Sequence, residues 1–219
     1  MRWDWGFVAE IMPALLQGLK ITVLATILGA ALAAALGLAF AIARRSRSRL
    51  VARGAGFLVE FIRGTPLLVQ LYVIFYVLPD LGLRLPPLLA GVVGMGLHYA
   101  TYAAEVYRAG IENVPRGQWE AARATNLSPR QTWVHVVLPQ AVPPMMPALA
   151  NYLIAMFKET PLLSAITVTE LMSQARSVAN SSYRYIEPIT MVGVLFLAIS
   201  LVSVALLRLL ERRHGRVAQ

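Results

Sequence analysis

The chain has 219 residues, of which 58% are hydrophobic and 14% charged, and its mean hydropathy is +0.62. This composition is typical of a protein that crosses a membrane several times, and it excludes a soluble domain with one buried core. The net charge of +9 does not indicate a nucleic-acid partner, because the arginines stand in short loops beside apolar segments, and the absence of cysteine excludes disulfides and thiolate chemistry.

The N-terminal part carries both charge signs and then becomes apolar. Residues 1–17 are interpreted as a segment outside the membrane, and residues 18–208 as one transmembrane domain. The first span is predicted at Ile21–Ala43, which has no charged residue and reaches the roughly 20 residues that a crossing helix needs. A signal peptide would have a shorter apolar core preceded by basic residues, whereas here the arginines follow it. We therefore expect a retained helix with its N-terminus outside.

A basic loop follows the first span, with Arg44, Arg45, Arg47, Arg49 and Arg53. Loops rich in arginine face the cytoplasm, so this loop helps to set the orientation. The second helix is predicted to begin at the cytoplasmic interface over residues 54–63. It completes its span over residues 64–79, with a kink at Pro66.

The third helix is predicted after a short outer loop at residues 80–85. It opens at Pro86 and is free of charge to Ala104. Glu105 and Arg108 follow, close enough on one helix face to pair, and we interpret them as an ion pair that braces the cytoplasmic end. His98 is expected to be a packed, hydrogen-bonded histidine rather than a ligand.

Residues 115–139, called the elbow below, are the longest polar interval between strongly apolar segments. A first short helix is predicted over about residues 117–125, followed by Asn126 in the left-handed conformation. Ser128 is expected to cap a second helix, with Gln131 completing a capping box. Two short helices at an angle would make a rigid cytoplasmic protrusion against which another protein could push.

The fourth span begins among prolines, and its regular helix is predicted over residues 144–157. At ~1.5 Å per residue this is about 21 Å, which is shorter than the ~30 Å hydrocarbon core. Lys158, Glu159 and Thr160 follow, and a polar break at membrane depth is tolerated only beside protein or a water-filled cavity. These three residues are therefore candidates for lining a solute path. The alternative is that Lys158 extends to the outer interface and Glu159 simply pairs with it.

Two further polar side chains, Gln70 on the second helix and Tyr102 on the third, are weaker candidates for the same path, because such groups more often bridge helices.

The last span is predicted at residues 188–207, after a polar outer stretch at residues 169–187. A basic tail, residues 209–219, follows it. Most of the 20 basic residues fall in the first basic loop, around the elbow and near the C-terminus, which places these regions in the cytoplasm. Five transmembrane helices, with the N-terminus outside and the C-terminus inside, fit this distribution.

The sequence contains no phosphate-binding loop. The only lysines are Lys20 and Lys158, and neither follows a glycine run, so the chain does not bind ATP in the P-loop manner. The three histidines are far apart, and no nucleophile–base pair is visible. We expect no enzymatic activity, cofactor or metal in this chain, so energy for active transport would have to enter through a partner.

The elbow resembles a known motif. Glu120, Ala121 and Ala122, then Asn126, then Leu138 and Pro139 are similar to the EAA loop of ABC importer permeases, where a glycine usually stands in place of Asn126. The resemblance implies that Glu120 contacts a separate ATPase subunit, that the two alanines allow close approach, and that Asn126 holds the bend.

Other stretches extend the resemblance from about Gly18 to Leu207. Residues 61–70 and 104–111 resemble the polar amino-acid uptake branch of these permeases, and residues 3–11 are similar to its ectoine/hydroxyectoine subgroup. An all-α, type I ABC importer permease bundle in the inner membrane of a prokaryote is implied.

The resemblance also implies partners. These are ATPase subunits that hold ATP and magnesium, a second permease subunit, identical or related, an external solute-binding protein, and a small polar solute. Two other classes stay open: a secondary transporter or channel acting alone, and a membrane scaffold without a transport path. The lack of an internal repeat argues against the secondary transporter.

Overall fold

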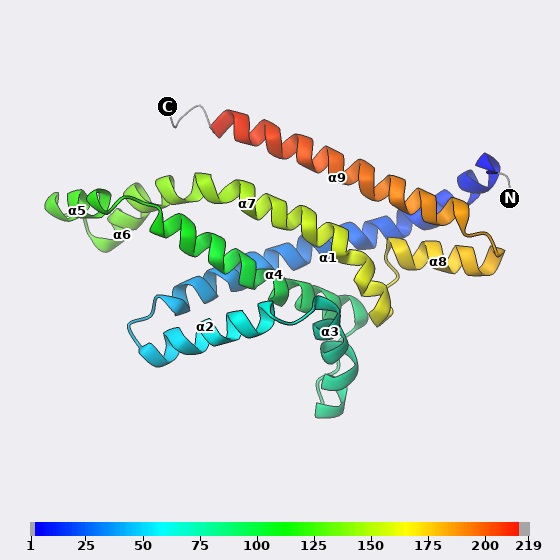
Figure 1. Ribbon diagram of the computed structural model, residues 1–219, viewed down its shortest axis with the longest axis horizontal. Helices are drawn as coiled ribbons and strands as arrows, with labels where there is room; N and C mark the ends of the chain where they lie inside the picture. Colours follow the sequence, from blue (N-terminus) through cyan, green and yellow to red (C-terminus); the bar gives the residue numbers. More distant parts are fainter. Residues whose placement is uncertain (1–2, 215–219) are drawn as a thin grey trace.

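The computed structural model describes residues 3–214, with side chains to Leu209, and every element in this range is helical. In chain order the helices are α1 (Trp5–Arg44), α2 (Arg49–Arg63), α3 (Leu67–Tyr72), η1 (Val73–Val77), η2 (Leu78–Leu81), α4 (Pro87–Glu112), α5 (Arg116–Ala124), α6 (Pro129–Gln131), η3 (Thr132–Val137), α7 (Leu138–Glu159), η4 (Thr160–Ile166), α8 (Leu171–Ser182) and α9 (Ile186–His214). Figure 1 shows α1, α7 and α9 along the long axis, with α5 and α6 at one end and the N-terminus at the other.

Helix α1 extends well beyond the predicted first span. It has 40 residues and begins at Trp5, where the Asp4 carboxylate accepts hydrogen bonds from the N–H groups of Gly6, at 2.8 Å, and Phe7, at 3.2 Å. This cap satisfies backbone donors that would otherwise lack partners. Residues 1–17 are thus helical from Trp5 onward and continuous with the span, while their location outside the membrane stays a prediction.

Two of the described helices, α1 and α9, are long and apolar enough to cross a membrane, and the pair α2 and Leu67–Leu81 makes a third if it counts as one span. The five-span count and the orientation remain predictions. The basic tail at residues 209–219 begins as the last turns of α9, and residues 215–219 lie outside the described range.

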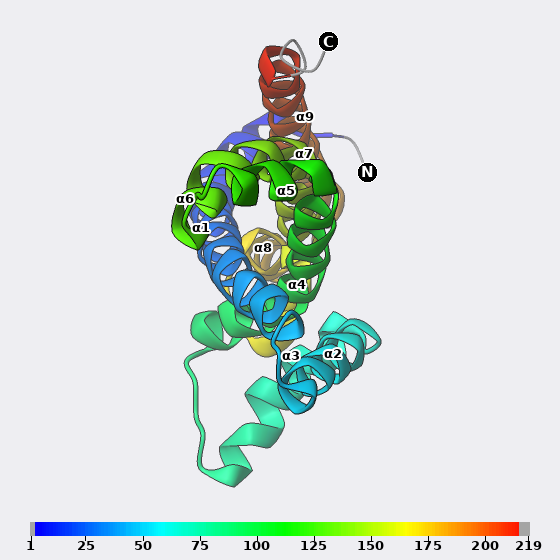
Figure 2. The same ribbon diagram turned by 90° about the vertical axis from the view of Figure 1, so that its left-hand side faces the viewer.

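The predicted kink at Pro66 is present as a sharp bend, because α2 and the following segment, Leu67–Leu81, meet at 102°. Pro66 has no N–H and adopts an extended conformation, with φ of −62° and ψ of 136°. The side-chain amide of Gln70 donates to the carbonyl oxygen of Ile62, at 2.6 Å, and to that of Thr65, at 3.0 Å, which satisfies acceptors that the broken helix leaves free. Figures 1 and 2 show the resulting arm, α3 to η2, leaving the main bundle.

The prediction of a short fourth helix is also wrong, because α7 is regular from Leu138 to Glu159 and holds Pro143, Pro144 and Pro147 in its interior. The wide π-helical turn η3 ends directly before Leu138. A widened turn gives room for the Pro139 ring, which would otherwise clash with the carbonyl four residues earlier. The prolines therefore do not delay the start of the helix, and α6, η3 and α7 form one uninterrupted helical stretch.

Helices α1 and α4 approach closely because Gly37 has no side chain. A Cβ atom at Gly37 would lie 2.7 Å from the Cβ of Ala103 and 2.9 Å from the carbonyl oxygen of Ala100. Small residues at such contacts allow membrane helices to pack backbone to backbone.

We predict that Gly37→Ala lowers the free energy of unfolding by about 1–3 kcal/mol, because the two helices must separate to admit a methyl group. Thermal unfolding in detergent measures this effect. Gly54→Ala in α2 is the matched control, since a Cβ there meets nothing within 4 Å. Equal melting temperatures for the two variants would contradict the close α1–α4 contact.

The carboxylate of Glu105 joins three helices at the elbow-side half of the bundle. Glu105 on α4 pairs with Arg44 at the end of α1, with Arg108 at 2.9 Å, and with Arg63 of α2 at 3.9 Å. The predicted Glu105–Arg108 pair is confirmed, and Arg44 and Arg63 are additions that the sequence could not reveal. This arrangement, called the Glu105 hub, holds α1, α2 and α4 together.

Glu105→Gln should leave the three arginines without their shared anion. Breaking a buried pair costs ~3–5 kcal/mol, and because the Glu105 side chain is 24% exposed we expect about 1–3 kcal/mol. The control is Glu60→Gln, whose side chain is 57% exposed and pairs with Arg63 alone among the described residues. Denaturation of the purified protein should show a larger loss for Glu105→Gln; the reverse order would refute the hub.

Candidate functional site

The elbow has the predicted caps and turn. Asn126 has a φ of 56°, in the left-handed region, and the N–H of Leu127 donates to the carbonyl oxygen of Ala122 at 3.0 Å. Ser128 and Gln131 form the capping box, with backbone-to-side-chain distances of 3.3 Å and 2.9 Å. The break between α5 and α6 is therefore fixed by backbone geometry, and asparagine holds a conformation that most residues avoid.

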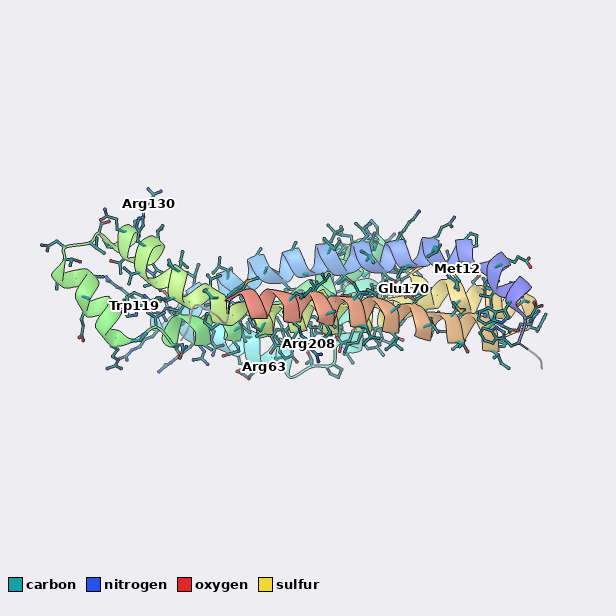
Figure 3. The ribbon with its side chains drawn as sticks, turned by 90° about the horizontal axis from the view of Figure 1, so that it is seen from above. Met12, Arg63, Trp119, Arg130, Glu170 and Arg208 are labelled. Atoms are coloured by element: carbon teal, nitrogen blue, oxygen red, sulfur yellow. The ribbon has the colours of Figure 1, made fainter. Side chains whose placement is uncertain are left out.

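The elbow is anchored to the bundle through an apolar cluster. The Trp119 ring on α5 meets the Trp133 ring of η3 edge-on, with centroids 5.4 Å apart, and both pack near buried Val137. This packing makes the elbow rigid relative to α4 and α7. In Figure 3, Trp119 and Arg130 lie at the elbow end of the molecule, whereas Met12 and Glu170 lie toward the other end.

The outer surface of the elbow carries only part of the predicted coupling set. Glu120 and Ala121 are exposed, and so are Leu138 and Pro139 at the start of α7. Ala122 is only 3% exposed, so its side chain packs inside the elbow and cannot contact a partner as the motif suggested. Its small size serves the close packing of α5 on the chain itself.

The predicted break after the fourth helix is present. At Thr160 the α-helix gives way to the tighter 3₁₀ helix η4, which ends at Thr167 with a φ of 66°. Lys158 is exposed and Glu159 is half-buried. Thr160 is fully buried, and its hydroxyl donates to the carbonyl oxygen of Phe157 at 2.7 Å. Thr160 therefore stabilises the helix end and does not present its hydroxyl to a path.

Glu159 pairs with a tyrosine rather than with Lys158. The Tyr99 hydroxyl donates to the Glu159 carboxylate at 2.9 Å, and among the described residues no ion pair joins Lys158 to Glu159. The alternative in which these neighbours neutralise each other is thus not what the chain adopts.

Tyr99, which holds this carboxylate, belongs to a cluster of aromatic rings. Tyr102 lies 5.4 Å from His98 and 5.3 Å from Tyr152, and Tyr99 lies 6.3 Å from Tyr152, all between centroids. His98 is buried as expected, but its Nδ1 atom has no hydrogen-bond partner in the described part of the chain. Tyr152, whose contribution the sequence analysis missed, could have been found from its position on the same predicted helix, six residues before Lys158.

Gln70 does not belong to this site. Its amide is used at the bend between α2 and α3, where it donates to two carbonyl oxygens and to the hydroxyl of Thr65 at 2.7 Å. The prediction that Gln70 lines the path is therefore not supported by its position. Gln70 instead stabilises the bend between α2 and α3.

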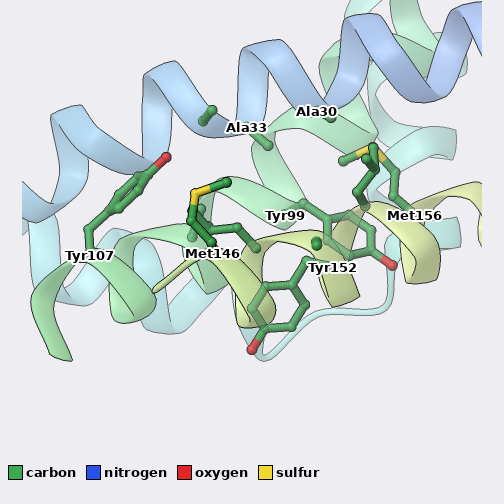
Figure 4. Close-up of a pocket in the computed structure, with 12 residues that line it drawn as sticks. Ala30, Ala33, Tyr99, Tyr107, Met146, Tyr152 and Met156 are labelled. Atoms are coloured by element: carbon green, nitrogen blue, oxygen red, sulfur yellow. The ribbon is translucent and has the colours of Figure 1, made fainter. Parts of the chain in front are cut away.

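A cavity of about 260 Å³ lies between α1, α4 and α7, beside the aromatic rings. Alanines and methionines form most of its wall, and three tyrosines, Tyr99, Tyr107 and Tyr152, supply its hydroxyl groups. Figure 4 shows Tyr107 at one end and Met156 at the other, below α1. The cavity extends from the region of Glu159 along the bundle toward the elbow half.

Comparison with known proteins gives a consistent result. Residues 33–216 match the family model described as "Binding-protein-dependent transport system inner membrane component". A probable amino-acid ABC transporter permease, y4tG of Sinorhizobium fredii, is 42% identical over 95% of this chain and 93% of its own length. The glutamine transport system permease GlnP of Escherichia coli is 35% identical over 97% and 98%.

A solved structure has the same fold. The crystal structure of an amino acid ABC transporter with histidines superposes with a TM-score of 0.90 at 35% sequence identity, covering 97% of this chain and all of the other.

Proposed function

Because this chain belongs to the family of binding-protein-dependent transport system inner membrane components, it is a multi-pass permease subunit of an ABC importer, and we propose that its cargo is a polar amino acid or an amino-acid-like compatible solute. The amino-acid permeases among its relatives support this solute class. Ectoine belongs among the solutes to test, because residues 3–11 resemble that subgroup. The family has no ATPase site of its own.

The elbow is proposed as the docking point for the ATPase subunits, which would carry ATP and magnesium. The observation that carries this proposal is the exposed Glu120 on a rigid, capped two-helix protrusion whose inner face is packed against the bundle. A second permease subunit and an external solute-binding protein complete the proposed complex. Closure of the ATPases would then bias the bundle between two states by their differential binding free energy.

Lys158 and Glu159 are proposed to meet the solute. A zwitterion presents a carboxylate and an ammonium group, and the chain offers one charge of each sign at the end of a regular helix, neither of them in an ion pair among the described residues. The adjacent cavity of about 260 Å³ is large enough for a small solute, and Tyr102 lies in the aromatic group beside it. Charged groups at membrane depth are costly, so those that occur there are often functional.

Five spans with the N-terminus outside are proposed for the membrane arrangement. The connection between α1 and α2, which contains the first basic loop, and the C-terminal end of α9 are both directed toward the elbow end of the molecule in Figure 1, which fits a cytoplasmic elbow.

Reconstitution into vesicles tests the function. With ATPase subunits and the solute-binding protein present, uptake of a radiolabelled amino acid should require both ATP and the binding protein. Uptake that continues without an ATPase would instead identify a secondary transporter or channel acting alone.

A further inference from the structure

A second cavity, of about 720 Å³, lies at the elbow end of the bundle, and its lining includes none of Glu120, Lys158 and Glu159. Its walls come from the last turns of α1, the loop after it, the start of α2, the end of α4, and η3 with the start of α7. The cavity therefore joins the first basic loop to the elbow. A ligand there would contact both.

The polar lining of this cavity is cationic. Arg45 and Ser46 face it, and no acidic residue is among its lining. Arg45 makes no ion pair within the described chain, and the same holds for Arg47, Arg49 and Arg53, which follow it. Such a group of uncompensated guanidinium groups favours an anion, and guanidinium matches the geometry of a phosphate.

The remainder of the lining is apolar and open. Leu38 is 48% exposed, Ile42 64%, Val51 48% and Leu138 42%. The apolar surface continues onto α2, where Leu50 is 84% exposed. Exposed aliphatic side chains of this extent in a membrane protein are covered by acyl chains, so lipid reaches the level of this cavity.

We propose that this cavity binds an anionic phospholipid of the cytoplasmic leaflet, with its phosphate at Arg45 and Ser46 and an acyl chain along Leu38, Ile42 and Val51. A soluble anion would leave the aliphatic walls uncovered, and a zwitterionic lipid would bring no net negative charge to the arginines. Basic pockets between membrane helices on the cytoplasmic side are suited to such head groups. Trp133 lines the same cavity and supplies an optical probe.

The test uses the full-length protein in nanodiscs of phosphatidylcholine, with a tenth of the lipid replaced by dibrominated phosphatidylglycerol or dibrominated phosphatidylcholine. Bromine quenches nearby indoles, and the signal of Trp133 is taken as the difference between the wild type and Trp133→Phe. Dibrominated phosphatidylglycerol should quench Trp133 more strongly than dibrominated phosphatidylcholine at the same fraction of the lipid. Equal quenching by the two lipids would overturn the proposal, because lipid would then reach Trp133 without any preference for an anionic head group.

Two arginine variants give the matched comparison. Arg45→Gln should weaken the preference for the anionic lipid about fivefold, because one charged contact near a membrane surface is worth ~1 kcal/mol. Arg47→Gln removes the same charge from the same loop but does not line the cavity, so it should keep the preference. Equal losses in the two variants would show only general attraction to a charged surface and would refute the site.

A third variant tests the cavity with Arg45 in place, so its result does not depend on whether Arg45→Gln folds. Val51→Trp fills the cavity from α2 and leaves every charged residue in place, so it should abolish the selective quenching of Trp133. The Trp133 signal is here the difference between Val51→Trp and the double variant that also carries Trp133→Phe. Retained selectivity would place the lipid elsewhere. These outcomes do not depend on transport, so they stay separate from the proposed importer function.

Discussion

Glu120→Arg is expected to lower ATP-driven uptake at least about 100-fold and to remove solute-stimulated ATP hydrolysis. Glu120 is exposed on α5 and is proposed to meet the ATPase, so the substitution reverses the charge at that contact. Like charges placed together at an interface cost several kcal/mol, and ~2.7 kcal/mol already corresponds to about 100-fold in affinity. Uptake and ATP hydrolysis in reconstituted vesicles measure the effect.

The control for this variant is Gln118→Arg. Gln118 is exposed on the same helix two residues earlier, so it points to another side of α5 while adding a positive charge. It should insert into the membrane and transport nearly normally. If both variants behave like the wild type, or if both fail alike, Glu120 is not the docking contact.

Glu159→Gln should raise the solute concentration needed for half-maximal uptake by about 10–100-fold. The amide can still accept the hydrogen bond from the Tyr99 hydroxyl, so the change removes the charge and little else. A hydrogen bond to a charged group is worth ~1.5–3 kcal/mol, which sets the expected range. Lys158→Ala should likewise change solute affinity or selectivity, because Lys158 supplies the opposite charge.

Tyr99→Phe separates contact with solute from support of the site. It removes the hydroxyl that holds Glu159 and leaves both charges in place. The proposed path predicts a smaller change than for Glu159→Gln. A 10–100-fold increase of the half-maximal solute concentration in Tyr99→Phe, with no change in Glu159→Gln, would mean that the carboxylate only positions the tyrosine. Wild-type transport of every tested solute by Glu159→Gln, Lys158→Ala and Tyr99→Phe would refute the proposed solute path.

The sequence predicts the features of this chain that depend only on residues close together in the sequence. The capping box at Ser128, the left-handed Asn126 and the break after Glu159 each depend on a few neighbouring residues, and the structure has all three. The Glu105–Arg108 pair could also be predicted, because the spacing of three positions on one helix sets its geometry.

Features set by distant contacts were missed. Arg44 and Arg63 come to Glu105 from other helices, and the 102° bend carries α3 into a buried cluster with residues of α4 and η4. The prolines of α7 predict a late start of that helix only if the preceding segment is an ordinary α-helix. The π-helical turn that precedes α7 is not visible in the sequence, and it removes this restriction. The sequence analysis predicts only a polar outer stretch at residues 169–187, where the structure has helix α8. The helical spacing of the buried residues Leu171, Ala175 and Ala179 is the signal that indicates this helix.

The uninterrupted helical stretch over residues 129–159 connects two distant parts of the chain. Residues 129–139 of this stretch belong to the elbow, and its last residues are Lys158 and Glu159. At ~1.5 Å per residue it is about 45 Å long, and the contact between Trp119 and Trp133 packs α5, which carries Glu120, against its first part. If the ATPase and the solute bind as proposed, a tilt of this stretch at the elbow also displaces its far end beside the solute, while the ion pairs of Glu105 hold α1, α2 and α4 together.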